Sequence, residues 1–217
     1  MCIRDSNMLN GLITTSENIV VRSISKENLL VKRVMDIVIC IVLLPIAIPL
    51  MVIGTIAIYL TSKGPAIFTQ KRVGLDGRIF TIYKIRTMTH CSTGYIDHTV
   101  VNDCRITKIG SILRKTKIDE LPQLFNVLIG DMSIIGPRPE RAEIVEKFTK
   151  ESNHYQYRHI IRPGITGWAQ VNNPVATPEE NLQKLEYDLY YINNYSLKLE
   201  VQILMRTVGV VSSLQSL

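Results

Sequence analysis

The feature that most constrains this chain is an apolar segment, residues 37–60, that contains no formally charged side chain. At about 1.5 Å of rise per residue, a helix of this length would reach across the hydrocarbon core of a bilayer. The segment lies too far from the start of the chain, and is too long, to be an ordinary signal-peptide core. We therefore expect it to lie in a membrane, with a buried helix of a soluble protein as the alternative.

Two prolines, Pro45 and Pro49, lie near the middle of this segment. Each removes a backbone donor and clashes with the preceding turn, so we expect a broken helix. Basic residues flank both ends of the segment: Lys26, Lys32 and Arg33 before it, and Lys63, Lys71 and Arg72 after it. Because Lys and Arg favour the cytoplasmic side, both flanks prefer the same side. The pattern predicts a re-entrant membrane helix over residues 31–61, with a straight, kinked transmembrane helix as the alternative.

The charged residues outside this segment are unevenly distributed along the chain. Residues 61–117 hold eleven Lys and Arg against three Asp and Glu, whereas residues 118–217 hold nine against twelve. A basic region beside a membrane segment suits anionic lipid, phosphate-bearing substrates or nucleic acid, and charge alone does not choose among them. Four scattered cysteines (Cys2, Cys40, Cys91 and Cys104) lack metal-ligand spacing and favour a reducing compartment.

The rest of the pattern predicts an α-rich α+β fold. We expect residues 1–30 to be disordered or interfacial, with residues 1–6 foreign to the native protein, and residues 62–217 to form a compact cytosolic catalytic domain. Extended segments at 66–70 and 78–88 flank a Gly/Asp turn and predict a hairpin. Residues 89–104 lack periodicity and are expected to form a mobile loop. Amphipathic or interfacial helices are expected around 106–115, 119–129, 140–157, 178–193 and 197–214.

Two adjacent carboxylates, Asp119 and Glu120, follow a run of basic residues in a mostly apolar stretch. One interpretation is structural: Asp119 caps the helix that follows, and Glu120 favours the helix dipole. The other is chemical, because a carboxylate is a nucleophile towards phosphorus and a nearby helix N-terminus stabilises phosphate charge. The local pattern allows both interpretations.

Phosphate chemistry also needs cations, and the sequence provides Arg114 five positions before Asp119, with further basic residues in nearby and more distant motifs. Arg138 lies between two prolines, which restrict its loop and reduce the entropy lost on binding a phosphate. Arg162 begins an Arg-Pro-Gly turn, while Lys84 and Arg86 share one face of an extended segment. Stiffened turns and a solvated basic edge are the structural alternatives. The usual nucleotide-hydrolase, dehydrogenase and protease motifs are absent from the sequence.

Taken together, these blocks resemble the bacterial sugar transferase family, the monotopic polyprenyl-phosphate phosphoglycosyl transferases that begin glycoconjugate assembly. The similarity runs from about residue 32 to about residue 191, and the chain is expected to be close to the minimal catalytic form. The blocks that carry it are KRVMD, GPAIFTQKRVGLDGRIFTIYKIRTM, LRKTKIDELPQLFNVLIGDMSIIGPRPE, RPGITGWAQVN and EYDLYY.

The resemblance implies a two-step mechanism. Asp119 would attack the β-phosphate of a UDP-sugar, release UMP and hold a covalent sugar phosphate, which undecaprenyl (polyprenyl) phosphate would then accept. Glu120 would complete a catalytic dyad, and Mg²⁺ would lie beside Asp119. The candidate phosphate- or substrate-binding residues are Arg114, Arg138, Lys84, Arg86, Arg162 and Asp188.

The same resemblance places the chain at the bacterial inner membrane, with its active site on the cytoplasmic face. Its products would enter capsule, exopolysaccharide, O-antigen or glycoprotein assembly, with downstream glycosyltransferases as candidate partners and no nucleic acid. A non-catalytic, lipid-binding module and a soluble nucleic-acid-binding protein are the rival hypotheses; retention of both carboxylates disfavours the first, and the apolar segment disfavours the second.

The chain departs from the family pattern at two points. Ile48-Pro49 replaces a frequent Ser-Pro pair at the helix break, and Asn172-Asn173-Pro174 replaces a frequent Asn-Gly-Arg. The first departure is expected to keep the bend with altered local bonding. The second is expected to alter sugar or nucleotide recognition, or to be compensated by another basic residue.

Overall fold

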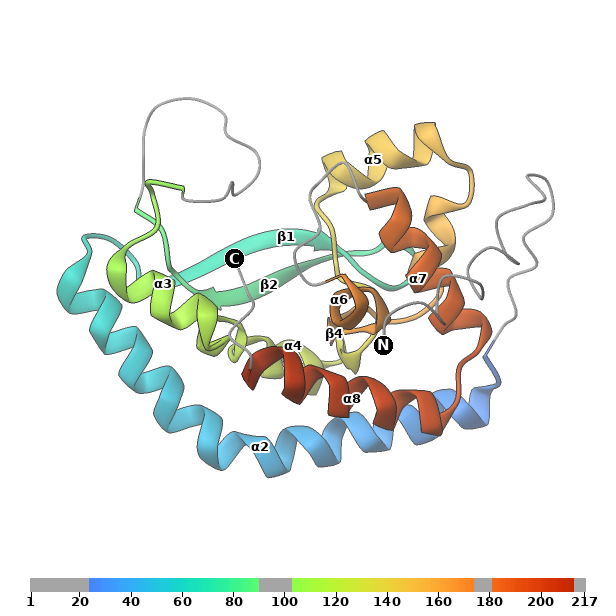
Figure 1. The fold of residues 1–217 in the computed structure, drawn as a ribbon, viewed down its shortest axis with the longest axis horizontal. Coiled ribbons are helices and arrows are strands. Elements are labelled where there is room, and N and C mark those ends of the chain that lie inside the picture. Colours follow the sequence, from blue (N-terminus) through green and yellow to red (C-terminus); the bar gives the residue numbers. More distant parts are fainter. Residues whose placement is uncertain (1–23, 90–102, 174–180, 213–217) are drawn as a thin grey trace.

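The computed structural model describes residues 24–89, 103–173 and 181–212, and shows a helix-rich α+β fold (Figure 1). The helices are α2 (Lys26–Thr61), α3 (Lys108–Lys115), α4 (Gln123–Ile129), α5 (Ala142–Glu151), α6 (Trp168–Asn172), α7 (Asn181–Asn193) and α8 (Leu197–Ser212). The strands are β1 (Ile67–Val73), β2 (Ile79–Ile85), β3 (Ser133–Ile135) and β4 (Gly164–Thr166), with 3₁₀ turns η1 (Leu75–Gly77), η2 (Ile118–Glu120) and η3 (Tyr155–His159). This confirms the expected fold class. Most of the expected 89–104 loop lies outside the described residues.

Helix α2 runs without interruption through Pro45 and Pro49, so the expected break is absent. Figure 1 shows α2 bent along the base of the molecule, with the other elements on its concave side. Both prolines are exposed on the side away from the domain. Because the two lie one helical turn apart, the lost hydrogen bonds and the proline clashes fall on one side of the helix, which bends there while the opposite side stays continuous.

One stripe of α2 packs against the domain along the length of the helix. Its buried residues recur at intervals of three, four or seven, the spacing of a single helix face. They are Lys32, Asp36, Cys40, Ala47, Met51, Gly54 and Ile58. The other faces expose most of the large apolar side chains that lie uncovered in the described part of the chain. Helix α2 therefore underlies the domain instead of projecting from it.

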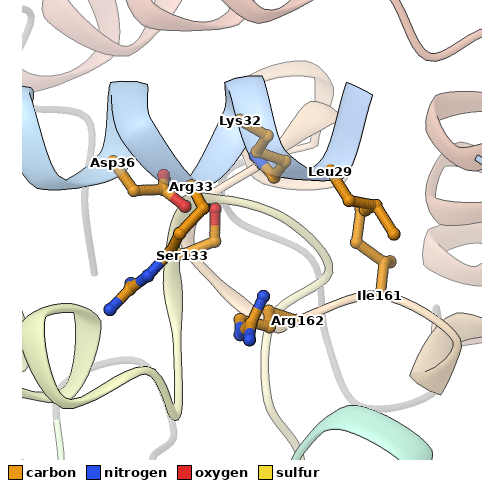
Figure 2. Close-up of a pocket in the computed structure, with 7 residues that line it drawn as sticks. All are labelled: Leu29, Lys32, Arg33, Asp36, Ser133, Ile161 and Arg162. Carbon is orange, nitrogen blue, oxygen red and sulfur yellow. Dashed lines mark hydrogen bonds between the residues drawn. The ribbon is translucent and has the colours of Figure 1, made fainter. Parts of the chain in front are cut away.

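Polar contacts attach the N-terminal part of α2 to the domain. The Lys32 Nζ lies 2.9 Å from the Glu200 Oε2 of α8, and both side chains are buried. The Asp36 Oδ1 accepts hydrogen bonds from the Ser133 hydroxyl and the Ile134 amide, both at 2.9 Å. Figure 2 shows Asp36 meeting Ser133 beneath the helix. These charges are compensated inside the protein, as burial requires.

A glycine lets the C-terminal part of α2 approach the domain closely. A Cβ atom on Gly54 would lie 3.1 Å from Ile85, 3.3 Å from Leu113 and 3.5 Å from Ile118. These three side chains belong to β2, α3 and η2. The turn that carries the two adjacent carboxylates is thereby packed directly on α2.

The predicted hairpin is confirmed. Strands β1 and β2 pair antiparallel from Ile67↔Ile85 to Val73↔Ile79. The connecting turn has positive φ at Asp76 (53°) and at Gly77 (75°), the conformation that Asp tolerates and Gly favours.

A short parallel pair, β3 with β4, brings the two proline-containing loops together. The Gly136 amide donates to the Thr166 carbonyl, and the Gly164 amide donates to the Pro137 carbonyl, both at 2.9 Å. A Cβ atom on Gly164 would lie 2.1 Å from the Gly136 nitrogen, so only glycine fits there. Since these amides bind backbone carbonyls, they support the structural interpretation of the Arg-Pro-Gly turn over a phosphate cradle.

Several helix boundaries differ from the sequence expectation. Helix α5 ends at Glu151, and η3 follows it, because the run of expected helix is interrupted at Ser152 by extended backbone. The last helix packs against the domain: the Arg206 Nη1 donates to the Asn172 Oδ1 at 2.7 Å and its guanidinium lies over the Trp168 ring. A basic side chain thus contacts the Asn172 block, from which the family arginine is missing.

Candidate active site

The two carboxylates lie in a strained turn between α3 and α4. Lys117 adopts φ 58° and ψ 15°, a left-handed conformation that non-glycine residues rarely adopt and that tends to occur at functional sites. Asp119 and Glu120 follow in η2, with 7% and 8% of their surfaces exposed. Helix α4 begins only after Pro122 and has no side-chain cap. The helix-cap interpretation of Asp119 is therefore wrong.

Glu120 is held between two cations from distant parts of the chain. Its Oε1 accepts from the Lys84 Nζ at 2.6 Å and from the Arg138 Nη2 at 2.8 Å. Strand β2 supplies Lys84, and the proline-bounded loop after β3 supplies Arg138. The structure thus brings Lys84 and Arg138 to the adjacent acids Asp119 and Glu120, so that four candidate residues from the sequence lie together.

The two neighbouring carboxylates differ in pKa. Burial acts to raise the pKa of Glu120, but Arg138 and Lys84 together hold that pKa well below its usual value. Burial, reinforced by the negative charge of Glu120, raises the pKa of Asp119 to about 6, with Lys84 opposing the rise. The buried Asp119 Oδ1 also has no hydrogen-bond partner. Glu120 is therefore paired and fixed, whereas Asp119 keeps an oxygen that no protein group engages.

Helix α3 contributes a third cation, Arg114, to the neighbourhood of the pair. Its Nε donates to the Thr87 hydroxyl at 2.8 Å. Burial lowers the pKa of Arg114, while the negative charge of Asp119 acts to raise it, which places the guanidinium within electrostatic reach of Asp119. Cations from three separate segments of the chain therefore act on the two acids.

Asp188 does not contact the carboxylate pair directly but is joined to Arg138 through Arg158. Its carboxylate binds Arg158 at 2.7 Å, and the same Arg158 nitrogen, Nη2, donates to the backbone carbonyl of Arg138 at 2.9 Å. The Tyr155 hydroxyl accepts a further bond from Arg158 Nη1 at 2.7 Å. The sequence reasoning missed Arg158; the signal for it was Asp188 itself, because a buried acid in a helix requires a basic partner.

The structure places Arg86 and Arg162 away from the carboxylates. The Arg86 Nη2 donates to the carbonyl of Ser62, the C-cap residue of α2, at 2.8 Å. The Arg162 Nε donates to the Gly130 carbonyl at 2.9 Å, beyond α4, and Figure 2 shows it under α2 together with Arg33. Cations at a helix C-terminus donate hydrogen bonds to the last carbonyls and interact favourably with the negative end of the helix dipole. Neither contact supports the substrate-binding roles expected for these two arginines.

A magnesium ion fits this site only if the substrate phosphates and water supply most of its ligands. In the part of the chain that the structure describes, no group of three His, Cys, Asp or Glu side chains forms a metal-binding cage. The unpartnered Asp119 Oδ1 offers one hard oxygen. Mg²⁺ commonly binds through one or two carboxylates together with substrate phosphates and water, so this donor set is compatible with it.

Comparison with known proteins gives the family. Residues 27–213 match the sequence model described as "Bacterial sugar transferase", which covers most of the chain, α2 included. The chain belongs to the bacterial sugar transferase family. Two named relatives are each 47% identical to it: the UDP-N-acetylgalactosamine-undecaprenyl-phosphate N-acetylgalactosaminephosphotransferase of Aeromonas hydrophila, over 82% of this chain, and the UDP-glucose:undecaprenyl-phosphate glucose-1-phosphate transferase of Xanthomonas campestris pv. campestris, over 73%.

The chain spans only 43% and 34% of the lengths of these two relatives. It spans 94% of a third, the "Exopolysaccharide production protein PSS" of Rhizobium leguminosarum bv. phaseoli, which is 38% identical over 83% of this chain. The names of the first two relatives share undecaprenyl phosphate as acceptor but differ in the sugar. Family membership therefore leaves the sugar open.

Proposed function

We propose that this bacterial sugar transferase moves a sugar 1-phosphate from a UDP-sugar to undecaprenyl phosphate, releases UMP, and so begins a lipid-linked glycan. The observation that carries the proposal is the asymmetry of the carboxylate pair. Asp119 has a buried oxygen without a partner, beside Glu120, which is neutralised by Lys84 and Arg138. Family members whose names state this transfer support the same reaction class.

In the proposed mechanism, an oxygen of Asp119 attacks the β-phosphorus of the UDP-sugar. The bond from that phosphorus to the bridging oxygen breaks, UMP leaves, and a sugar phosphate remains on Asp119. A phosphate oxygen of undecaprenyl phosphate then attacks the same phosphorus and frees the carboxylate. Arg114 and Arg138 offset the phosphate charge that would repel an anionic nucleophile. Mg²⁺, when bound at Asp119, would supply further charge neutralisation.

The identity of the released nucleotide tests this reaction. Purified protein in detergent, given Mg²⁺, undecaprenyl phosphate and each of a panel of UDP-sugars, is expected to release UMP with one or a few of the sugars. UMP is expected because the phosphorus attacked is the one that carries the sugar. Chromatography of the nucleotides measures the result. Release of UDP would mean ordinary glycosyl transfer and would contradict the proposal.

We further propose that α2 enters and leaves the membrane on the cytoplasmic side. Helix α2 is long and apolar enough to cross a membrane, yet both of its ends contact the same compact domain, through Lys32 at one end and Ile58 at the other. A straight span would place those ends on opposite sides of the bilayer. A bent helix with an exposed apolar outer face satisfies the contacts and the burial together.

Cysteine labelling tests this topology. With all four native cysteines (Cys2, Cys40, Cys91 and Cys104) replaced by serine or alanine, single cysteines introduced at Lys26 and Lys71 are expected to react only with reagents that reach the cytoplasm. Lys26 is the first residue of α2 and Lys71 lies after α2 in β1, and both are exposed. In intact cells, a membrane-impermeant maleimide should label neither, and in inverted vesicles it should label both. Labelling of one position in each preparation would restore the straight-span alternative.

A further inference from the structure

The loop that carries Arg138 is attached to strand β1 immediately after that arginine. The carbonyl of Pro139 accepts a hydrogen bond from the Arg72 Nη1 at 3.2 Å. The next carbonyl, that of Glu140, accepts from the Val73 amide at 2.9 Å. Because the proline also restricts the backbone, these two bonds fix the direction in which the Arg138 side chain leaves the loop.

Arg72 itself is held by several partners at once. Besides the Pro139 carbonyl, its Nη1 lies 3.5 Å from the Glu140 Oε2, and its Nη2 donates to the Gln70 Oε1 at 2.7 Å. The side chains of Arg72 and Glu140 are only 19% and 12% exposed. A planar guanidinium presents its donors in a fixed fork, so it sets the angle between these acceptors as well as their distance.

Arg72 and Lys84 lie on the same face of the β1–β2 hairpin. Arg72 is paired directly with Phe80, and residues paired across an antiparallel ladder share a face. Lys84 lies four residues after Phe80 in β2 and therefore points to that face too. From it, Lys84 binds the Glu120 Oε1 directly, while Arg72 holds the loop whose Arg138 binds the same oxygen. One face of the hairpin therefore aligns both cations on Glu120.

We propose that Arg72 is a positioning residue for the transfer reaction, an assignment that rests on the proposed function. Its hydrogen bonds reach the loop, and Arg138 of that loop reaches Glu120. By holding the Pro139 carbonyl and the Glu140 carboxylate, Arg72 keeps the Arg138 guanidinium where it neutralises Glu120 and meets the substrate phosphates. Its effect on the reaction passes through Arg138.

Kinetics of three single variants test this role. Arg72→Met is expected to lower kcat/KM for the UDP-sugar about tenfold or more, because a small displacement of a charge-bearing group is costly to the reaction. Arg72→Lys should recover part of the loss, since an ammonium can bind the Pro139 carbonyl but cannot reproduce the fork. Arg78→Met is the matched control, because Arg78 is an exposed arginine of the same hairpin. Equal kcat/KM values for Arg72→Met and Arg78→Met would overturn the proposal.

A double variant separates positioning from folding. Arg72→Met leaves the largely buried Glu140 carboxylate without its partner, so a loss of stability is expected. Combining it with Glu140→Gln removes that unpaired charge and should restore stability, as measured by urea unfolding. The low kcat/KM should persist, because the Pro139 carbonyl still lacks its donor. Recovery of full activity together with stability would show that Arg72 serves the fold alone and would overturn the proposal.

Hydrogen exchange tests the loop attachment without any turnover. The reporter is the Val73 amide, which donates to the Glu140 carbonyl. In the full chain in detergent, this amide is expected to exchange about tenfold faster in the double variant than in Arg78→Met, because the loop detaches more often from β1. Equal exchange rates would overturn the assignment. Faster exchange, in a protein whose wild type releases no UMP from any UDP-sugar, would reject the proposed reaction while retaining the hold of Arg72 on the loop.

Discussion

Asp119→Asn is expected to abolish UMP release while stabilising the substrate-free protein. The loss of activity follows because an amide oxygen cannot serve as the proposed nucleophile. The gain in stability follows because burial raises the pKa of Asp119 from the usual 3.8 to about 6. The folded state then binds this proton more tightly than the unfolded state does, so stability falls as pH rises from about 4 through about 6. Near pH 7.5 the ionised carboxylate costs on the order of 2–3 kcal/mol, which asparagine removes.

Thermal unfolding in detergent with EDTA measures the stability change, and UMP release with Mg²⁺ measures the activity. The variant is expected to be more stable than wild type at pH 7.5, with the difference shrinking towards pH 4. Asp76→Asn is the matched control, because it removes the same charge from an exposed turn whose positive φ asparagine tolerates. A pH-independent difference, or full activity in Asp119→Asn, would contradict the assignment of this residue.

Asp188→Asn is expected to destabilise the fold severely and to reduce activity through Arg138. The change leaves the buried Arg158 charge without its counterion, and such a loss typically costs about 3–5 kcal/mol. Because Arg158 also binds the Arg138 carbonyl, the loop that presents the Arg138 guanidinium to Glu120 should lose its support. Urea unfolding and kcat/KM measure the two effects.

A second variant separates the two effects. Asp188→Asn combined with Arg158→Met removes both buried charges, and it should recover much of the stability without recovering full activity, since the Arg138 carbonyl still lacks its donor. Glu146→Gln is the control, because its ion pair with Lys150 is solvent-exposed and its loss should leave unfolding unchanged. Full activity in the double variant would show that Arg158 does not position Arg138.

The sequence by itself determined the elements whose signals are local. An uncharged apolar run predicted α2, and β-branched and aromatic residues around a Gly/Asp turn predicted the β1–β2 hairpin. The combined blocks also indicated the family. These predictions held because hydrophobic periodicity and turn chemistry depend on near neighbours in the chain.

The tertiary structure decided how the local elements are used. The prolines were expected to break α2, but the helix bends continuously around a domain that covers its concave side. The capping interpretation of Asp119 was locally reasonable, yet the left-handed Lys117 puts that residue in a separate 3₁₀ turn before α4 begins. Residue spacing along the chain does not decide whether the helix breaks or where Asp119 lies, because tertiary packing selects among the conformations that the local sequence permits.

The roles within the basic set were decided in the same way. Four cations stand out in sequence motifs, but they have different partners in the structure. Lys84 and Arg138 bind Glu120. Arg86 and Arg162 instead bind backbone carbonyls at the C-terminal ends of helices. The sequence determined that a carboxylate pair and several cations exist. Only the tertiary structure decided which cations neutralise Glu120 and leave Asp119 unpaired, because burial and charge pairing depend on residues far apart in the chain.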